Sequence, residues 1–233
     1  RRQRQMCIRD RDDHHGQDEP VVMEKITGQF RLESVTAAYA GTKALNIPSL
    51  SINAGEKVGV LGPVGAGKTT LLRVLSGMYR PVEGRVLLDG VDLAHIAKPA
   101  LAEAMGFVAQ DGRLFAGTLR ENIILGLIDP GDDAILAAAR QTGLLPVVIN
   151  QLPKGLQHPI AEGGTGLSGG QRQLVNLTRA FLRKPRIWLL DEPTASMDRN
   201  LEAHVVGALK AAVQTEDTLV LVTHKAELLE LCD

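Results

Sequence analysis

Residues 62–69 read Gly-Pro-Val-Gly-Ala-Gly-Lys-Thr, which is the spacing of a phosphate-binding loop. Glycines leave consecutive backbone N–H groups free to turn toward a polyanion, and a helix after the loop adds the positive end of its dipole. Lys68 can bridge the β- and γ-phosphates, and the Thr69 hydroxyl can bind Mg²⁺. We therefore expect nucleotide contacts from nine consecutive residues: Gly62, Pro63, Val64, Gly65, Ala66, Gly67, Lys68, Thr69 and Thr70.

Two adjacent acids follow the apolar run at residues 187–190, which predicts a buried strand. Asp191, at the tip of that strand, can hold Mg²⁺ through water, and Glu192 can orient or deprotonate an attacking water molecule. Two acids at a strand end are by themselves more often a solvated turn. The phosphate loop earlier in the chain favours the catalytic interpretation.

A second anion cradle is predicted at residues 167–173, Leu-Ser-Gly-Gly-Gln-Arg-Gln, just before a helical pattern. Ser168 is a good N-cap, and the two glycines allow the helix terminus to approach a phosphate closely. Two phosphate cradles can serve one nucleotide if they come from different copies of the chain. The expected contacts of this second cradle are Ser168, Gly169, Gly170 and Gln171.

The elements that position these residues alternate between strands and helices. Strand patterns occur at residues 30–35, 57–61, 85–88, 106–109, 186–190 and 218–222, and helical patterns at 67–76, 132–141, 143–151, 169–183 and 201–213. Pro146 is expected to make the helix at 143–151 start late or kink. The alternation predicts an α/β fold with a mainly parallel sheet, whose ligands bind at the carboxyl ends of the strands. Residues 115–167 show no strand pattern, so we expect an inserted helical subdomain at about 112–183.

Composition excludes several classes of protein. The chain has 233 residues, of which 44% are hydrophobic and 23% charged, and a net charge of −1. This balance is ordinary for a globular domain, and it gives no electrostatic footprint for nucleic acid. Two cysteines at opposite ends form no disulfide framework.

Residues 1–19 hold five Arg, four Asp and one Glu and almost no apolar side chains, which predicts a disordered or non-native tail. Within it, residues 6–11 look like a translated sequencing adapter.

With both cradles in place, the sequence resembles the nucleotide-binding domain of ATP-binding cassette (ABC) proteins, whose signature is the LSGGQ of residues 167–171. The resemblance runs from about Phe30 to the C-terminus. It implies a P-loop NTPase fold of the ABC type, with a mainly parallel sheet core, an antiparallel β subdomain and an inserted helical subdomain. It also implies ATP and Mg²⁺ as ligands, and a head-to-tail dimer that sandwiches each ATP.

The resemblance further assigns residues that the sequence alone would leave as ordinary surface or structural groups. Tyr39, before a pair of strands, matches the aromatic residue that stacks on adenine. Gln110 matches the glutamine that reaches Mg²⁺ or the lytic water, and His224 matches the histidine that contacts the γ-phosphate. The implied catalytic group is Glu192, His224, Gln110 and Lys68, and the implied metal ligands are Thr69, Gln110 and Asp191. Residues 195–198 resemble the D-loop, with Met197 where leucine is commoner.

Three segments resemble ABC exporters in particular: residues 110–123, residues 162–166 and residues 223–229. The closest resemblance is to the motor of bacterial type I protein-secretion exporters, which implies a protein or peptide cargo. The implied partners are a second nucleotide-binding domain, in a homodimer, and transmembrane domains on the same parent chain. The implied location is the cytoplasmic face of the plasma membrane. We expect no nucleic-acid partner.

Two alternatives remain, the ATPase subunit of an ABC importer and a non-transport ABC ATPase. The segment between Gln110 and Leu167 is too short for the long coiled coil of chromosome-maintenance ATPases, and only one cassette is visible. The chain ends at Asp233, where the family continues into another strand and a closing helix. We therefore expect residues 20–233 to be an ABC domain truncated at its C-terminus.

Overall fold

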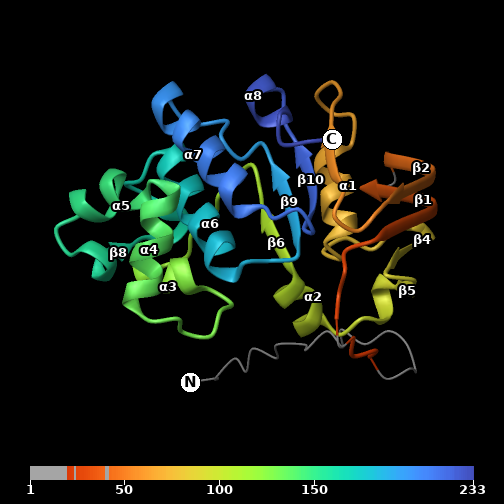
Figure 1. Ribbon diagram of the computed structural model, residues 1–233, viewed down its shortest axis with the longest axis horizontal. Coiled ribbons are helices and arrows are strands. Elements are labelled where there is room, and N and C mark those ends of the chain that lie inside the picture. Colours follow the sequence, from red (N-terminus) through yellow and green to blue (C-terminus); the bar gives the residue numbers. More distant parts are fainter. Residues whose placement is uncertain (1–19, 24, 40–41) are drawn as a thin grey trace, which may run out of the picture.

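The computed structural model describes residues 20–23, 25–39 and 42–233, without the side chains at 39, 42 and 43 (Figure 1). The predicted tail at 1–19 lies outside the described residues. Within the described part of the chain, no helix is long and apolar enough to cross a lipid bilayer.

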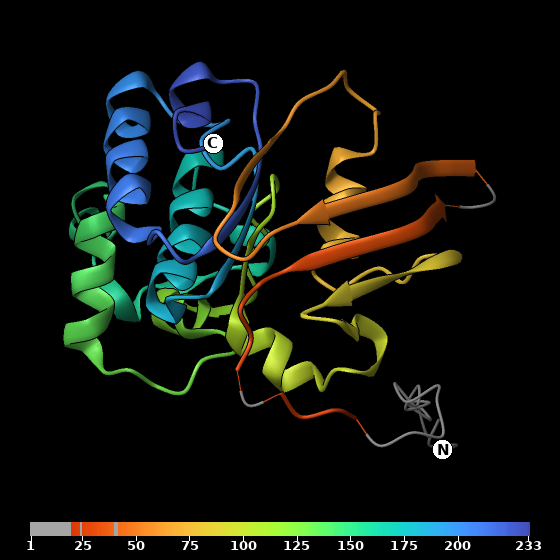
Figure 2. The same cartoon turned by 45° about the vertical axis from the view of Figure 1, so that its right-hand side comes forward.

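One sheet is antiparallel, in the order β2-β1-β4-β5. Its strands are β1 (Phe30–Tyr39), β2 (Thr42–Ile52), β4 (Glu83–Leu88) and β5 (Val91–Asp92). Figure 2 shows β1 and β2 running side by side as the two longest strands. Alternation along β1 buries Phe30 and Leu32 and turns Arg31 toward solvent, as expected for a sheet with one covered face.

The second sheet is parallel throughout, in the order β3-β10-β9-β6. Its strands are β3 (Lys57–Val60), β10 (Thr218–Val222), β9 (Ile187–Asp191) and β6 (Met105–Val108). The register places Val60, Val222 and Asp191 opposite one another, so neighbouring strands finish at the same level. These carboxyl ends lie toward the top of Figure 1. The two sheets confirm the predicted fold class.

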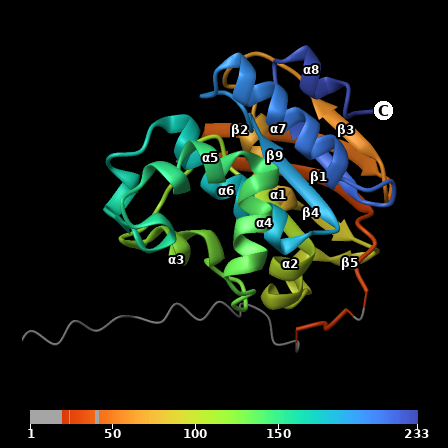
Figure 3. The ribbon, with the colours of Figure 1, turned by 60° about the vertical axis from the view of Figure 1, so that its left-hand side comes forward.

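Eight α-helices surround the sheets in the described residues (Figures 1 and 3). They are α1 (Lys68–Leu75), α2 (Lys98–Ala104), α3 (Leu119–Ile124), α4 (Asp132–Thr142), α5 (Leu144–Val147), α6 (Gly169–Arg183), α7 (Arg199–Ala212) and α8 (Ala226–Leu229). Short 3₁₀ turns lie at Leu93–His95, Ile149–Gln151, Gly155–Gln157 and Glu162–Gly164. Figure 1 shows α3, α4 and α5 on the side of α6 away from the antiparallel sheet.

The structure corrects three local expectations. The helix predicted at 143–151 begins at Leu144 without delay, and it ends after one turn because the backbone at Val148 leaves helical geometry. Pro146 fits in that first turn, where an N–H has no helical partner. A two-residue ribbon of β7 (Gly117–Thr118) and β8 (Pro159–Ile160) lies within the segment expected to lack strands. Two residues are too few to give a periodic pattern.

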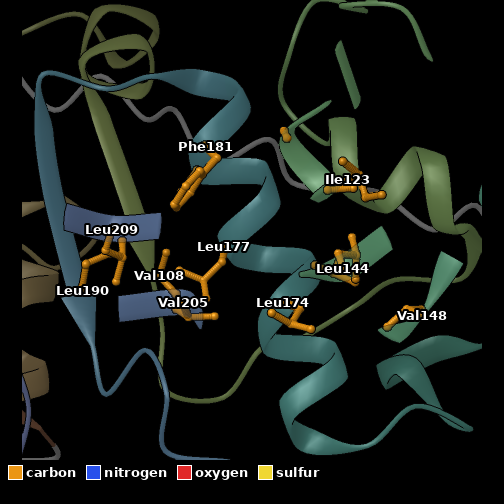
Figure 4. Close-up of a cluster of buried hydrophobic side chains, with 14 of the residues drawn as sticks. Val108, Ile123, Leu144, Val148, Leu174, Leu177, Phe181, Leu190, Val205 and Leu209 are labelled. Carbon is orange, nitrogen blue, oxygen red and sulfur yellow. The ribbon is translucent and has the colours of Figure 1, made fainter. Parts of the chain in front are cut away.

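A separate hydrophobic core packs on each face of the parallel sheet. Trp188 and Leu190 of β9 enter a core with α4, α6 and α7, whereas Ile187 and Leu189 enter a core with α1 and the antiparallel sheet. Figure 4 shows α6 at the centre of the first core: Val108, Leu190, Val205 and Leu209 lie on one side of it, and Ile123, Leu144 and Val148 on the other. Helix α6 therefore joins the sheet to the helices α3–α5.

Truncation of Leu177 tests the joining role of α6. Leu177 is fully buried in the middle of this helix, so Leu177→Ala should lower the free energy of unfolding by about 2–5 kcal/mol through lost contacts and a residual cavity. Leu125→Ala, at a position 43% exposed, is the matched control and should change it by about 0.5 kcal/mol or less. Urea unfolding of the three chains gives the comparison, and equal midpoints for both variants would contradict it.

Candidate functional site

The phosphate loop connects β3 to α1 at the edge of the parallel sheet. Gly67 is the N-cap of α1 and has left-handed geometry with φ 88°, and a Cβ there would overlap the carbonyl oxygen of Ala44. The Lys68 ammonium donates to the carbonyl oxygens of Gly62 (2.6 Å) and Pro63 (2.9 Å), which lays the side chain across its own loop. Thr69 is half-buried and Thr70 is buried. The glycines thus allow a tight loop in which the Lys68 ammonium bonds to the loop's own carbonyl oxygens.

Asp191 ends β9 as a nearly inaccessible carboxylate. It is 1% exposed, and among the described residues its Oδ2 atom is buried without a hydrogen-bond partner. A buried carboxylate oxygen costs free energy unless it is paired or binds a cation. Carboxylate and hydroxyl oxygens are the donors that Mg²⁺ prefers. Asp191 and Thr69 therefore fit the predicted metal ion.

Glu192 stands directly after β9 and is held tightly at its backbone. Its φ is 46°, in the left-handed region that glycine favours. Its N–H donates to the carbonyl oxygen of Val222 (2.8 Å), and its carbonyl oxygen accepts from Gln173 Nε2 (2.7 Å). The side chain is 13% exposed, with Oε1 3.5 Å from Nε2 of His224. The carboxylate therefore faces the histidine that follows β10.

The segment after β10 is tied to the segment after β9 by a second, ionic contact. Lys225 Nζ lies 2.7 Å from Glu202 Oε1 and donates to the Thr194 carbonyl oxygen (2.9 Å). Thr194 Oγ1 in turn donates to the same Glu202 oxygen (3.1 Å). Thr194 is fully buried, so this cluster fixes the chain next to His224 without using His224 itself.

Gln110 follows β6, two residues beyond the end of that strand, and is exposed. The four parallel strands thus deliver the phosphate loop, His224, the pair Asp191–Glu192 and Gln110 to one edge of the sheet, in that spatial order. This is the edge at which open α/β sheets bind their ligands.

The second cradle lies at the N-terminus of α6. Ser168 Oγ accepts from the Gln171 N–H (3.2 Å), and Gln171 Oε1 accepts from the Ser168 N–H (2.9 Å), so the two side chains form a capping box. A Cβ at Gly170 would lie 2.6 Å from the carbonyl oxygen of Ser196, and one at Gly169 3.1 Å from Ser196 Oγ. Glycine at these two positions was expected to make room for a phosphate. It also makes room for Ser196 of the same chain.

A family model described as ABC transporter matches residues 45–195, more than half of the chain. The chain belongs to the ABC transporter family. The predicted family and the ABC fold are thereby confirmed.

Named relatives and a solved structure agree with this assignment. An ATP-dependent lipid A-core flippase from Ralstonia nicotianae is 37% identical over 221 residues, covering 93% of this chain and 37% of the flippase. The mycobactin import ATP-binding/permease protein IrtB from Mycolicibacterium thermoresistibile is 37% identical over 196 residues, covering 84% of this chain and 34% of IrtB. A bacterial Atm1-family ABC exporter with ATP bound matches with a TM-score of 0.80 at 30% identity, over 92% of this chain and 39% of that one. The chain spans little more than a third of the length of these relatives.

One predicted site feature of this ABC domain is placed differently from the expectation. Tyr39 is the last residue of β1, within the strand pair and not before it, and its side chain lies outside the described residues. Its adenine contact stays a prediction. The Ser168 cradle lies at the N-terminus of α6, and this helix packs against β6, one outer strand of the parallel sheet. The phosphate loop follows β3, which is the outer strand on the other side of that sheet.

Sequence reasoning missed Gln173 and the Lys225–Glu202 pair. Gln173 recurs with Gly170, Leu174 and Leu177 on the buried face of α6, so a polar residue within an apolar helical stripe was the available signal. The ion pair gave no such signal, because 23 positions separate Glu202 from Lys225 in sequence.

Substitution of Gly65 and of Gly67 distinguishes the cost of backbone strain from the cost of steric overlap. Gly65→Ala and Gly67→Ala both place alanine at positive φ, which costs about 1–2 kcal/mol of unfolding free energy. Only Gly67→Ala also drives a Cβ into the Ala44 carbonyl, since no described atom lies within 4 Å of a Cβ at Gly65. Gly67→Ala should therefore lose more stability in urea unfolding. Equal losses would show that the loop shifts freely away from β2.

Proposed function

We propose that this chain is the ATP-hydrolysing motor domain of an ABC exporter. The observation that carries the proposal is the shared edge of the parallel sheet, where the phosphate loop, Asp191, Glu192, His224 and Gln110 leave neighbouring strands. A phosphate cradle, an oxygen donor set for Mg²⁺ and a carboxylate for the lytic water are the parts that phosphoryl transfer to water requires. The export direction and the membrane partner rest on the sequence resemblance.

Each residue has a definite part in hydrolysis. The loop N–H groups and Lys68 bind the β- and γ-phosphates. Asp191 and Thr69 would hold Mg²⁺, which would neutralise phosphate charge. Glu192 accepts a proton from water at its carboxylate while the water oxygen attacks the γ-phosphorus and the bond to the β-phosphate oxygen breaks. His224, 3.5 Å from Glu192, is placed to hold a γ-phosphate oxygen and orient the carboxylate. The products are ADP and phosphate.

The two cradles support a head-to-tail dimer of nucleotide-binding domains. In one chain they lie near opposite outer strands of the parallel sheet. The phosphate loop follows β3, and the Ser168 cradle is on α6, which packs against β6. Ser168 is exposed and presents a capped helix N-terminus, which is suited to a phosphate oxygen. In the dimer, Lys68 of one copy and Ser168 of the other bind the same ATP.

Residues 111–118 and 162–164 support a contact with transmembrane domains. The Ala116 N–H donates to Glu162 Oε2 (3.1 Å), and the Gly163 N–H donates to the Leu114 carbonyl oxygen (2.9 Å). Phe115 is 48% exposed within this connected surface. A large exposed aromatic side chain on an otherwise bonded surface suits a protein partner. We infer that the transmembrane domains of the parent protein dock here, at the cytoplasmic face of the plasma membrane.

The proposed cargo class comes from the sequence resemblance. The resemblance of residues 110–123 and 223–229 to type I secretion exporters favours a protein or peptide. The named relatives carry other cargo names, lipid A-core and mycobactin, and the second name states import. Import by the same motor is therefore the alternative. Uptake or release of a labelled peptide by vesicles that contain the whole parent protein separates the two directions.

Removal of the loop cation tests nucleotide binding. Lys68→Ala deletes a charge-assisted bond to phosphate, so the Kd for ATP should rise about 10- to 100-fold, as loss of about 1.5–3 kcal/mol predicts. Lys154→Ala, an exposed lysine outside the site, is the matched control and should leave the Kd unchanged. Isothermal titration with Mg-ATP measures both. An unaltered Kd in Lys68→Ala would contradict the phosphate assignment.

Replacement of the catalytic carboxylate tests hydrolysis and assembly together. Glu192→Gln should retain ATP binding and slow hydrolysis by about 10²- to 10⁴-fold, because the general base is lost. The trapped ATP should shift the chain from monomer to dimer in size-exclusion chromatography with light scattering.

Two results would contradict this account. Hydrolysis at the parent rate would exclude Glu192 as the base. A dimer that survives Ser168→Glu in the Glu192→Gln background would exclude the sandwich, since a carboxylate at the helix N-terminus would repel the phosphates of the partner's ATP.

A further inference from the structure

Gln173 connects the signature helix to the backbone of Glu192. It lies in α6 five positions after Ser168 and is 1% exposed. Its Nε2 atom donates to the Glu192 carbonyl oxygen at 2.7 Å, a short and well-formed bond. A buried side chain with a single polar contact of this kind transmits any displacement of the helix to the residue that it holds.

The second polar atom of Gln173 shows which interaction the side chain provides. Among the described residues, Oε1 is buried and has no hydrogen-bond partner. A carbonyl oxygen can only accept, so the amide NH₂ must face Glu192 and Oε1 must face away. A methionine or leucine would fill this space without burying an unpaired oxygen. The bond to Glu192 is therefore the distinctive contribution of the glutamine at this position.

Glu192 needs external support because its conformation is intrinsically unfavourable. Residues with a Cβ rarely adopt a φ of 46°. The peptide groups are held from three directions: the N–H by the Val222 carbonyl (2.8 Å), and the carbonyl by Gln173 and by the Ala195 N–H (3.2 Å). The Ala195 bond comes from the same turn as Glu192, and the Val222 bond comes from the adjacent strand β10. Only the Gln173 bond comes from α6.

We propose that Gln173 is a positioning residue for hydrolysis, which sets the direction of the Glu192 carboxylate through its backbone. The proposal rests on the proposed function, in which Glu192 acts on water. In the head-to-tail dimer, the helix that presents Ser168 to one ATP also steers the base that acts on the other ATP. Gln173 thus couples the two nucleotide sites through a single chain.

The test compares Gln173→Met with a matched control on the same helix. Gln173→Met keeps the length and burial of the side chain and removes the donor. Thr178→Val removes another buried polar group of α6, five residues beyond Gln173. Its Oγ1 donates to the Leu174 carbonyl oxygen (2.8 Å) and shares a hydrogen bond with Thr142 Oγ1 (2.7 Å). Gln173→Met should lower kcat for ATP about 10- to 100-fold with an unchanged KM, as a misplaced catalytic group does, whereas Thr178→Val should leave both values near the parent.

A double-mutant cycle distinguishes positioning from a general loss of structure. If Gln173 acts through the Glu192 carboxylate, Gln173→Met should cause no further loss of kcat in a Glu192→Gln background. Additive losses would overturn the proposal. If Gln173→Met does not fold, Gln173→Leu serves in its place, because it also fills the buried space without a hydrogen-bond donor.

Hydrogen exchange of the full chain gives a readout that does not require hydrolysis. The Glu192 and Ala195 N–H groups should exchange faster in Gln173→Met and at the parent rate in Thr178→Val. Unchanged exchange at both positions would overturn the proposal even if kcat falls. Failure of the proposed function would look different, because the parent chain itself would then bind or hydrolyse no ATP while the exchange difference persisted.

Discussion

Parallel hydrogen bonding among β3, β10, β9 and β6 is the interaction on which the site depends. It brings Val60, Val222 and Asp191 to one level, so the phosphate loop, His224 and Glu192 follow their strands from the same edge. The bond from the Glu192 N–H to the Val222 carbonyl extends this ladder by one residue into the site. A shift of β9 by one residue would turn the Asp191 side chain to the other face of the sheet.

The two hydrophobic cores hold this register from both sides. Alternate residues of β9 and β10 enter opposite cores, so neither strand can slide without exposing one face of apolar side chains. Helix α6 completes one core with Leu174 and Leu177 while its N-terminus carries Ser168. The same packing that stabilises the fold therefore fixes the position of the second cradle relative to the first.

The sequence predicted most reliably the features whose physical cause is local. The phosphate loop, the capping Ser168 and the acids after β9 each depend on a few consecutive residues and one flanking element, and all three lie where expected. The β7–β8 ribbon and the one-turn helix α5 are too short to produce a period, and β2 was not recognised as a strand. The contact between Gln173 and Glu192 joins residues 19 positions apart in different elements, so no sequence pattern could specify it.

The sequence predicted the pair Gly169–Gly170 as part of a phosphate site, but it did not show that packing within the chain also requires glycine there. These glycines suit close approach to a phosphate, yet a side chain at Gly170 would first meet the Ser196 carbonyl of the same chain. Residues 194–198 are themselves fixed, because the Asp198 carboxylate caps α7 through the N–H groups of Asn200 and Leu201 (both 3.0 Å). The surface around Ser168 is therefore preorganised before any second copy binds. In the proposed dimer, less conformational entropy would then be lost on association, because ATP would bridge two surfaces that are already ordered.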